Sequence, residues 1–147
     1  MERKNAWNTY TEEQLKALED VAARYRRFLD AGKTERACVN WMVAEAKARG
    51  FEDLQQRIAK GTVLQPGEKV YVNCMGKAMI LFLIGAAPLE QGMNIVGAHI
   101  DSPRLDVKQN PLYEEGDFAY LDTHYYGGIK KYQWVTLPMA IHGVVVK

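Results

Sequence analysis

The feature that most constrains the fold is a change in hydrophobic spacing near residue 65. Between residues 11 and 50, apolar residues recur every three or four positions, which is the spacing of amphipathic helices. From residue 65 onward, apolar residues alternate with polar ones or form short unbroken runs, and both patterns are typical of β-strands. Two or three helices followed by a mostly hydrophobic sheet predict an α/β or α+β layer architecture.

The helical part carries clear start and stop signals. We expect Thr11 to begin the first helix with Gln14 completing a capping box, and Gly32 to end it. Thr34 and Gly50 are expected to begin and end the second helix. The residues expected to face a core are Leu15, Leu18, Val21, Tyr25, Phe28 and Leu29 in the first helix, Ala37, Cys38, Trp41 and Met42 in the second, and Phe51, Leu54 and Ile58 in a short third helix.

Strands are predicted in the middle of the chain. Residues 70–74 alternate as in a half-buried strand, residues 75–77 form a turn, and residues 78–84 run back as a more fully buried strand. Residues 94–98 are expected to form a further buried strand, directly before a cluster of polar residues.

Beyond Pro111 the pattern predicts mainly β structure. We expect a turn at 114–117, a strand at 118–121, an aromatic and glycine-rich loop at 124–128, and a strand at 137–146. This change assigns residues 1–110 to one α/β domain and residues 111–147 to the start of a second, β domain. Because the last strand pattern runs to the end of the sequence, we expect the chain to be a piece of a longer polypeptide.

Composition excludes several classes of protein. A net charge of +1 gives no general attraction to nucleic acid or to anionic membranes. The longest apolar run, residues 78–87, is too short to span a bilayer, and the charged residues 1–5 are followed by no apolar leader segment. The two cysteines, Cys38 and Cys74, form no CxxC motif, so we expect packing residues in a reduced, cytoplasmic protein.

The candidate site is the pair His99 and Asp101. On an extended chain, residues two apart project from the same face, so the imidazole and the carboxylate would point together. A metal-binding imidazole needs its second nitrogen held by a carboxylate or carbonyl, and Asp101 could serve that role. A single His-x-Asp pair is also compatible with a hydrogen-bonded structural histidine. The pair cannot hold zinc alone, because a catalytic zinc takes three protein ligands.

Five segments in this order resemble the zinc aminopeptidase family of aspartyl aminopeptidase and vacuolar aminopeptidase I. The resemblance covers nearly the whole chain and implies that it corresponds to the amino-terminal third of such an enzyme. It implies the start of a zinc-exopeptidase, phosphorylase/hydrolase-like α/β domain with a mixed sheet, followed by the start of an inserted β domain. The segments are KTER at residues 33–36, GAHIDSPRL at 97–105, YGG at 126–128, Trp134, and LPMAIHGV at 137–144.

The resemblance also implies a mechanism. Family members carry two zinc ions bridged by an aspartate and a water, and they remove the amino-terminal residue of a peptide. His99 matches a metal ligand, and Asp101 matches the aspartate that supports the site beside it. The family's general base lies in a Glu-Glu pair beyond residue 147, and Glu114-Glu115, placed in a turn, is not that pair. The chain alone is therefore expected to be inactive, with weak zinc affinity at best.

Partners follow from the same resemblance. We expect a peptide substrate and a homo-oligomer, a dodecamer built from dimers, with an interface or lid-lining surface at Tyr125, Tyr126, Tyr132 and Trp134. Lys130-Lys131-Tyr132 mixes basic and aromatic residues as single-strand binders do, but two lysines are too few for us to expect nucleic-acid binding. Arg104 could meet an acidic substrate side chain or form a surface salt bridge. His124 and His142 are expected to be structural or surface residues.

A second class of function stays open. The chain could be a non-catalytic module that kept the helices and the β domain for assembly or binding. The intact pair His99 and Asp101 favours the enzyme fragment.

Overall fold

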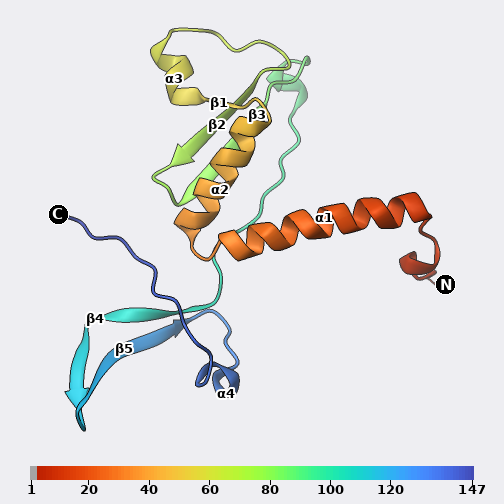
Figure 1. Ribbon diagram of the computed structural model, residues 1–147. Helices are drawn as coiled ribbons and strands as arrows, with labels where there is room; N and C mark the ends of the chain where they lie inside the picture. Colours follow the sequence, from red (N-terminus) through yellow and green to blue (C-terminus); the bar gives the residue numbers. More distant parts are fainter. Residues whose placement is uncertain (1–2) are drawn as a thin grey trace. The chain divides into compact units, whose positions relative to one another are not determined.

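The computed structural model describes residues 3–147 and forms two compact units, Met1–Ile100 and Asp101–Lys147 (Figure 1). Residues 1 and 2 lie outside the described part. The expectation that no leader segment follows the charged residues 1–5 therefore rests partly on residues that are not described. The predicted domain boundary at residue 110 falls inside strand β4 (Arg104–Glu115). The assignment to two domains stays a prediction.

Both long helices begin where the sequence predicts. Helix α1 (Glu12–Ala31) follows a capping box, in which Thr11 Oγ1 accepts a hydrogen bond from Gln14 N and Gln14 Oε1 accepts one from Thr11 N. Helix α2 (Glu35–Ala48) is capped by Thr34, whose Oγ1 accepts a hydrogen bond from Ala37 N. A short 3₁₀ turn, η1 (Ala6–Asn8), precedes α1, and a second, η2 (Leu89–Gln91), follows the sheet.

The first unit contains a mixed three-stranded sheet in the order β1-β2-β3. Strand β1 (Glu52–Asp53) pairs parallel with β2 (Lys69–Cys74), and helix α3 (Leu54–Ala59) follows β1 directly. Strand β3 (Ala78–Leu83) pairs antiparallel with β2. The predicted turn between them is confirmed, since Met75 and Gly76 both have positive φ, as the connection of a tight hairpin requires.

Helix α2 packs against β2 and β3 and builds the core with them (Figure 1). Val39 and Val70 are the largest fully buried side chains among the described residues. Cys38 was placed correctly on the buried side of α2, whereas Trp41 and Met42 are only half-buried. The buried apolar residues of the described chain are Cys38, Val39, Ala46, Val70 and Tyr71.

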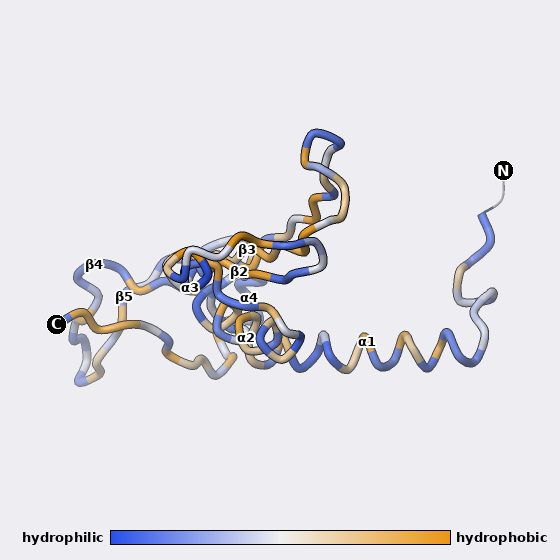
Figure 2. Tube along the Cα trace, turned by 90° about the horizontal axis from the view of Figure 1, so that it is seen from above, coloured by the Kyte–Doolittle hydropathy of each residue, from blue (hydrophilic) through white to orange (hydrophobic). Residues whose placement is uncertain are grey.

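Two predictions of burial are wrong. The apolar face of α1 is largely exposed, with Tyr25 at 59% and Val21 at 56%, although hydrophobic and hydrophilic residues alternate along this helix as expected (Figure 2). Strand β3 forms where predicted but is not buried, since Leu81 is 51% and Leu83 is 67% exposed. An apolar pattern indicates the face that can be covered, and α2, which contacts both α1 and β3, leaves much of these two faces exposed.

The predicted strand at residues 94–98 is also wrong. This segment has no regular secondary structure, and Val96 is 98% exposed. A strand exists only where a neighbour completes its hydrogen-bond ladder, and no described strand pairs with this segment.

The second unit is a two-stranded ribbon. Strand β4 pairs antiparallel with β5 (Phe118–Tyr126), and the short helix α4 (Lys131–Trp134) follows. The turn predicted at 114–117 is confirmed for Gly116 and Asp117, which both have positive φ, but Glu114 and Glu115 were wrongly placed in it, since they pair with β5 at the end of β4. The pairing is irregular between Val107 and Leu112, where Pro111 has no N–H to donate.

Two predictions for the second unit need correction. The aromatic segment predicted as a loop continues β5 through Tyr126, because its residues pair in register with the start of β4. The strand predicted at 137–146 does not form, since residues 138–147 have no regular structure and no described partner strand. Within residues 3–147, no helix combines the length and apolar character needed to cross a membrane.

Candidate functional site

His99 lies in the irregular segment that ends the first unit, and its side chain is exposed. Gly97, two residues earlier, has no atom of the described residues within 4 Å of where a Cβ would stand. The chain is therefore uncrowded around this glycine, as expected for a place that another group must approach.

Asp101 begins the second unit, and the ribbon holds its carboxylate. The hydroxyl of Tyr126, the last residue of β5, donates a hydrogen bond to Asp101 Oδ2 at 2.8 Å. This length is ordinary for an O–H···O bond. The two residues are 25 positions apart in sequence, and the antiparallel return of β5 brings them together.

Arg104 supports the same tyrosine. Arg104 and Tyr126 are directly opposite each other in the β4–β5 pairing, and the guanidinium carbon lies 4.2 Å from the centre of the tyrosine ring. Arg104 Nε donates to Asp106 Oδ1 at 2.7 Å, so the guanidinium is held from the side as well. Of the two roles considered for Arg104, the salt bridge is formed in the structure.

A glycine with a left-handed backbone follows β5. Gly127 has φ +73°, and a Cβ there would stand at an ordinary van der Waals distance, 3.4 Å, from atoms of Pro103. The positive φ therefore favours glycine at this position. Gly127 thus serves the local backbone geometry next to Tyr126.

The described residues do not complete a zinc site. An exposed imidazole such as His99 is a ligand that zinc prefers, and His99 fits as one ligand. Within residues 3–147, however, no group of three or more His, Cys, Asp or Glu side chains is placed to hold a metal ion. His124 and His142 are both exposed, as expected for surface residues.

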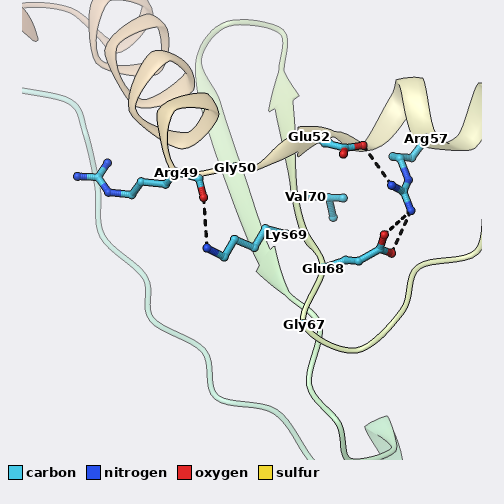
Figure 3. A pocket seen from close by; sticks show the side chains of 8 residues that line it. All are labelled: Arg49, Gly50, Glu52, Arg57, Gly67, Glu68, Lys69 and Val70. Atoms are coloured by element: carbon cyan, nitrogen blue, oxygen red, sulfur yellow. Dashed lines mark hydrogen bonds and ion pairs between the residues drawn. The ribbon is translucent and has the colours of Figure 1, made fainter.

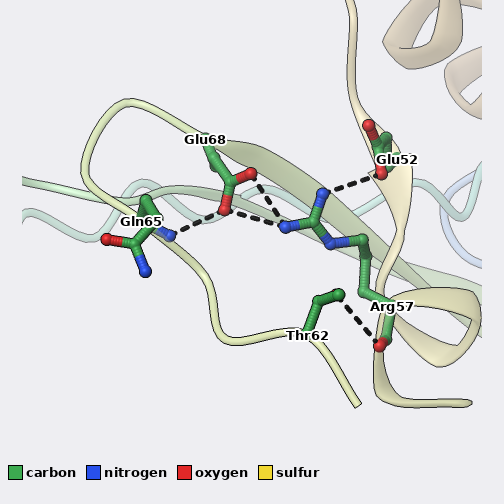
Figure 4. Close-up of polar contacts among 5 residues, drawn as sticks. All are labelled: Glu52, Arg57, Thr62, Gln65 and Glu68. Atoms are coloured by element: carbon green, nitrogen blue, oxygen red, sulfur yellow. Dashed lines mark hydrogen bonds and ion pairs between the residues drawn. The ribbon is translucent and has the colours of Figure 1, made fainter. Parts of the chain in front are cut away.

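The most connected polar cluster of the first unit is structural. It lines a shallow pocket between α3 and the start of β2 (Figure 3). Arg57 Nη2 contacts both oxygens of Glu68 at 2.8 and 2.9 Å, and its Nη1 contacts Glu52 at 3.1 Å (Figure 4). Glu68 also accepts a hydrogen bond from Gln65 N at 2.7 Å. That backbone bond and the Arg57 guanidinium lower the pKa of the Glu68 carboxyl, and these carboxylates raise the pKa of Arg57.

The Tyr126–Asp101 bond is not predicted by the sequence analysis. The YGG segment carries the family resemblance alone, and no spacing rule links residues 25 apart. A signal was nevertheless present, because a tyrosine directly before two glycines marks a strand end that can approach another segment.

Comparison with known proteins assigns the family. The sequence profile described as "Aminopeptidase I zinc metalloprotease (M18)" matches residues 28–147. A Clostridium acetobutylicum protein named "Probable M18 family aminopeptidase 1" is 56% identical over 146 residues, which are 99% of this chain and 31% of that protein. Its counterpart in Thermotoga maritima is 41% identical over 147 residues, again 31% of its length.

Solved structures agree. The crystal structure of aminopeptidase I from Clostridium acetobutylicum matches all of this chain and 32% of that protein, with a TM-score of 0.81 and 56% identity. Aminopeptidase I from Borrelia burgdorferi matches 92% of this chain with the same TM-score and 38% identity. The chain spans about a third of the length of these relatives. Its sequence and its mixed α/β fold place it in the M18 family of aminopeptidase I zinc metalloproteases.

Proposed function

We propose that this chain is the amino-terminal part of a metallo-aminopeptidase that removes the amino-terminal residue of peptides at a dinuclear zinc site. The observation that carries the proposal is the family match over residues 28–147, which includes the His99 and Asp101 motif. In this proposal His99 is one zinc ligand, and Asp101 supports the site beside it. Zinc in such a site would polarise the scissile carbonyl.

The 147-residue chain by itself is proposed to be inactive. A catalytic zinc takes three protein ligands, and within residues 3–147 no group of three or more His, Cys, Asp or Glu side chains is placed to hold a metal ion together with His99. Purified chain incubated with zinc and aminoacyl p-nitroanilides should release no p-nitroaniline. Zinc-dependent turnover by the chain alone would refute this part of the proposal.

A hybrid enzyme tests the role of His99. In it, residues 1–147 replace the matching amino-terminal third of the Clostridium acetobutylicum protein, which is 56% identical over this region. We expect the hybrid to cleave aminoacyl p-nitroanilides, and His99→Ala to abolish both cleavage and the binding of one zinc equivalent. The matched control is His124→Ala, which changes another exposed histidine, outside the segments that carry the family resemblance, and should leave both unchanged. Full activity in the His99→Ala hybrid would contradict the proposal.

We further propose that the complete protein is cytoplasmic and forms a homo-oligomer, a dodecamer built from dimers. The alternative function, a non-catalytic assembly module, is supported by the exposed apolar residues of the ribbon, among them Phe118 at 67% and Leu121 at 47%. Native mass spectrometry with zinc analysis separates the two functions. If the complete protein forms a large assembly with about two zinc ions per site, as expected for a dinuclear centre, the enzyme function is supported. If the assembly contains no zinc, the function as a non-catalytic module is supported.

A further inference from the structure

We infer that Tyr126 is a positioning residue of the aminopeptidase site, acting through Asp101. The inference rests on the proposed function, because it matters for catalysis only if Asp101 supports the metal-binding side of that site. Its structural basis is the 2.8 Å hydrogen bond from the Tyr126 hydroxyl to Asp101 Oδ2.

The bond holds one oxygen of the Asp101 carboxylate. Asp101 precedes β4 in a stretch without regular structure, so no strand ladder holds its backbone. A hydroxyl donor on Oδ2 restricts rotation about the Cβ–Cγ bond and directs the plane of the carboxylate. A group that supports a metal-binding imidazole has to be oriented in this way, because it sets the direction and basicity of the ring.

Tyr126 is itself held through both its backbone and its ring. The backbone of β5 pairs it with Arg104, the Arg104 guanidinium lies over its ring, and Asp106 fixes that guanidinium at 2.7 Å. The donor is therefore positioned by contacts within the ribbon.

The first test asks whether the hydrogen bond exists in the 147-residue chain. The reporter is the ¹³Cγ resonance of the Asp101 carboxylate at neutral pH, which responds to the loss of a donor. Tyr126→Phe removes only the hydroxyl and should shift this resonance. The matched control is Tyr120→Phe, which lies on the same strand and has nearly the same exposure, 42% against 41%. An Asp101 resonance that is unchanged in Tyr126→Phe overturns the inference.

The second test uses the hybrid enzyme and measures zinc affinity together with kcat and KM. Tyr126→Phe should weaken zinc binding about tenfold and lower kcat with little change in KM, as expected for loss of a group that orients a metal-binding residue without touching the metal. Tyr120→Phe should change none of these. If Tyr126 acts through Asp101, the double variant Asp101→Ala/Tyr126→Phe should bind zinc no more weakly than Asp101→Ala alone, since alanine leaves no acceptor for the hydroxyl.

The outcomes separate the inference from the proposed function. If His99→Ala loses zinc binding while Tyr126→Phe behaves like Tyr120→Phe, the inference is overturned and the proposed function stands. Additive losses in the double variant overturn the action through Asp101. If the His99→Ala hybrid binds zinc normally, both the inference and the proposed function are overturned. If the hybrid without any substitution is inactive, that result counts against the proposed function only, and the Asp101 resonance decides the inference.

Discussion

Truncation of Val39 should show how strongly the small core holds the first unit together. Val39 lies on α2 with no exposed surface, and α2 contacts both β2 and β3. With so few buried apolar side chains among the described residues, one lost contact is a large fraction of the stabilising packing. The substitution Val39→Ala therefore tests whether the α2–sheet interface is the stabilising core.

The expected loss of unfolding free energy in Val39→Ala is the sum of three contributions. Removing two methyl groups from a fully buried side chain costs about 1.6 kcal/mol of transfer free energy. The partly relaxed cavity adds about 1 kcal/mol. The better helix propensity of alanine offsets about 0.5 kcal/mol of this loss. The net loss of about 2 kcal/mol corresponds to roughly a 30-fold fall in the folding equilibrium constant.

Urea unfolding followed by far-ultraviolet circular dichroism measures this loss. The matched control is Val21→Ala, the same substitution in the interior of a helix at a side chain that is 56% exposed. This control keeps the gain in helix propensity and removes little buried area. Its free energy of unfolding should therefore change by no more than about 0.5 kcal/mol, as is typical of surface substitutions. Equal midpoints for the two variants would show that α2 is not packed on the sheet in solution, and would refute the reasoning.

Three further predictions concern caps, pH and thiol reactivity. Thr34→Ala removes the acceptor of the Ala37 N–H at the start of α2 and should cost about 1 kcal/mol of stability in the same urea assay. The pKa of the Glu68 carboxyl is lowered below its ordinary value of 4.5, so the stabilisation by its charged form is present above pH 4.5 and is lost as pH falls through the pKa of the folded state. Glu68→Gln should therefore reduce the loss of stability at acid pH. An unchanged acid limb of the pH–stability curve would contradict this. Burial raises the pKa of the buried Cys38 thiol, so in folded chain a disulfide reagent should label the half-buried Cys74 first, and reversal of that order in mass spectra would contradict the assigned burial.

Local signals in the sequence were sufficient for the ends of the helices and for the turns. Thr11 and Thr34 cap their helices as predicted, because a cap depends on residues within three positions of it. The hairpin turn at Met75 and Gly76 was likewise readable from the residues that form it. The mixed α/β character followed from the change in spacing alone.

Burial and strand formation were not readable in the same way, because both depend on partners far away in sequence. The run ending in Leu83 has the composition of a strand covered on both faces, yet Leu81 and Leu83 are largely exposed although α2 contacts this strand. Residues 94–98 have the composition of a strand but no ladder to join. The bond between Asp101 and Tyr126 was missed for the same reason, since only the pairing of β4 with β5 brings the two residues together.

The exposed strand and the incomplete metal site have a single explanation under the proposed function. The relatives are about three times as long as this chain, so about two thirds of such a protein would be available to cover β3 and to pair with residues 94–98. The same segments would have to bring the remaining zinc ligands to His99. If residues 94–98 become a strand only when that partner is present, His99 would gain a fixed position at the same moment as the other ligands arrive. Metal binding and completion of the sheet would then be coupled, and zinc should protect the amides of residues 94–98 from hydrogen exchange in the hybrid but not in the 147-residue chain. Equal protection with and without zinc in the hybrid would show that the sheet closes independently of the metal.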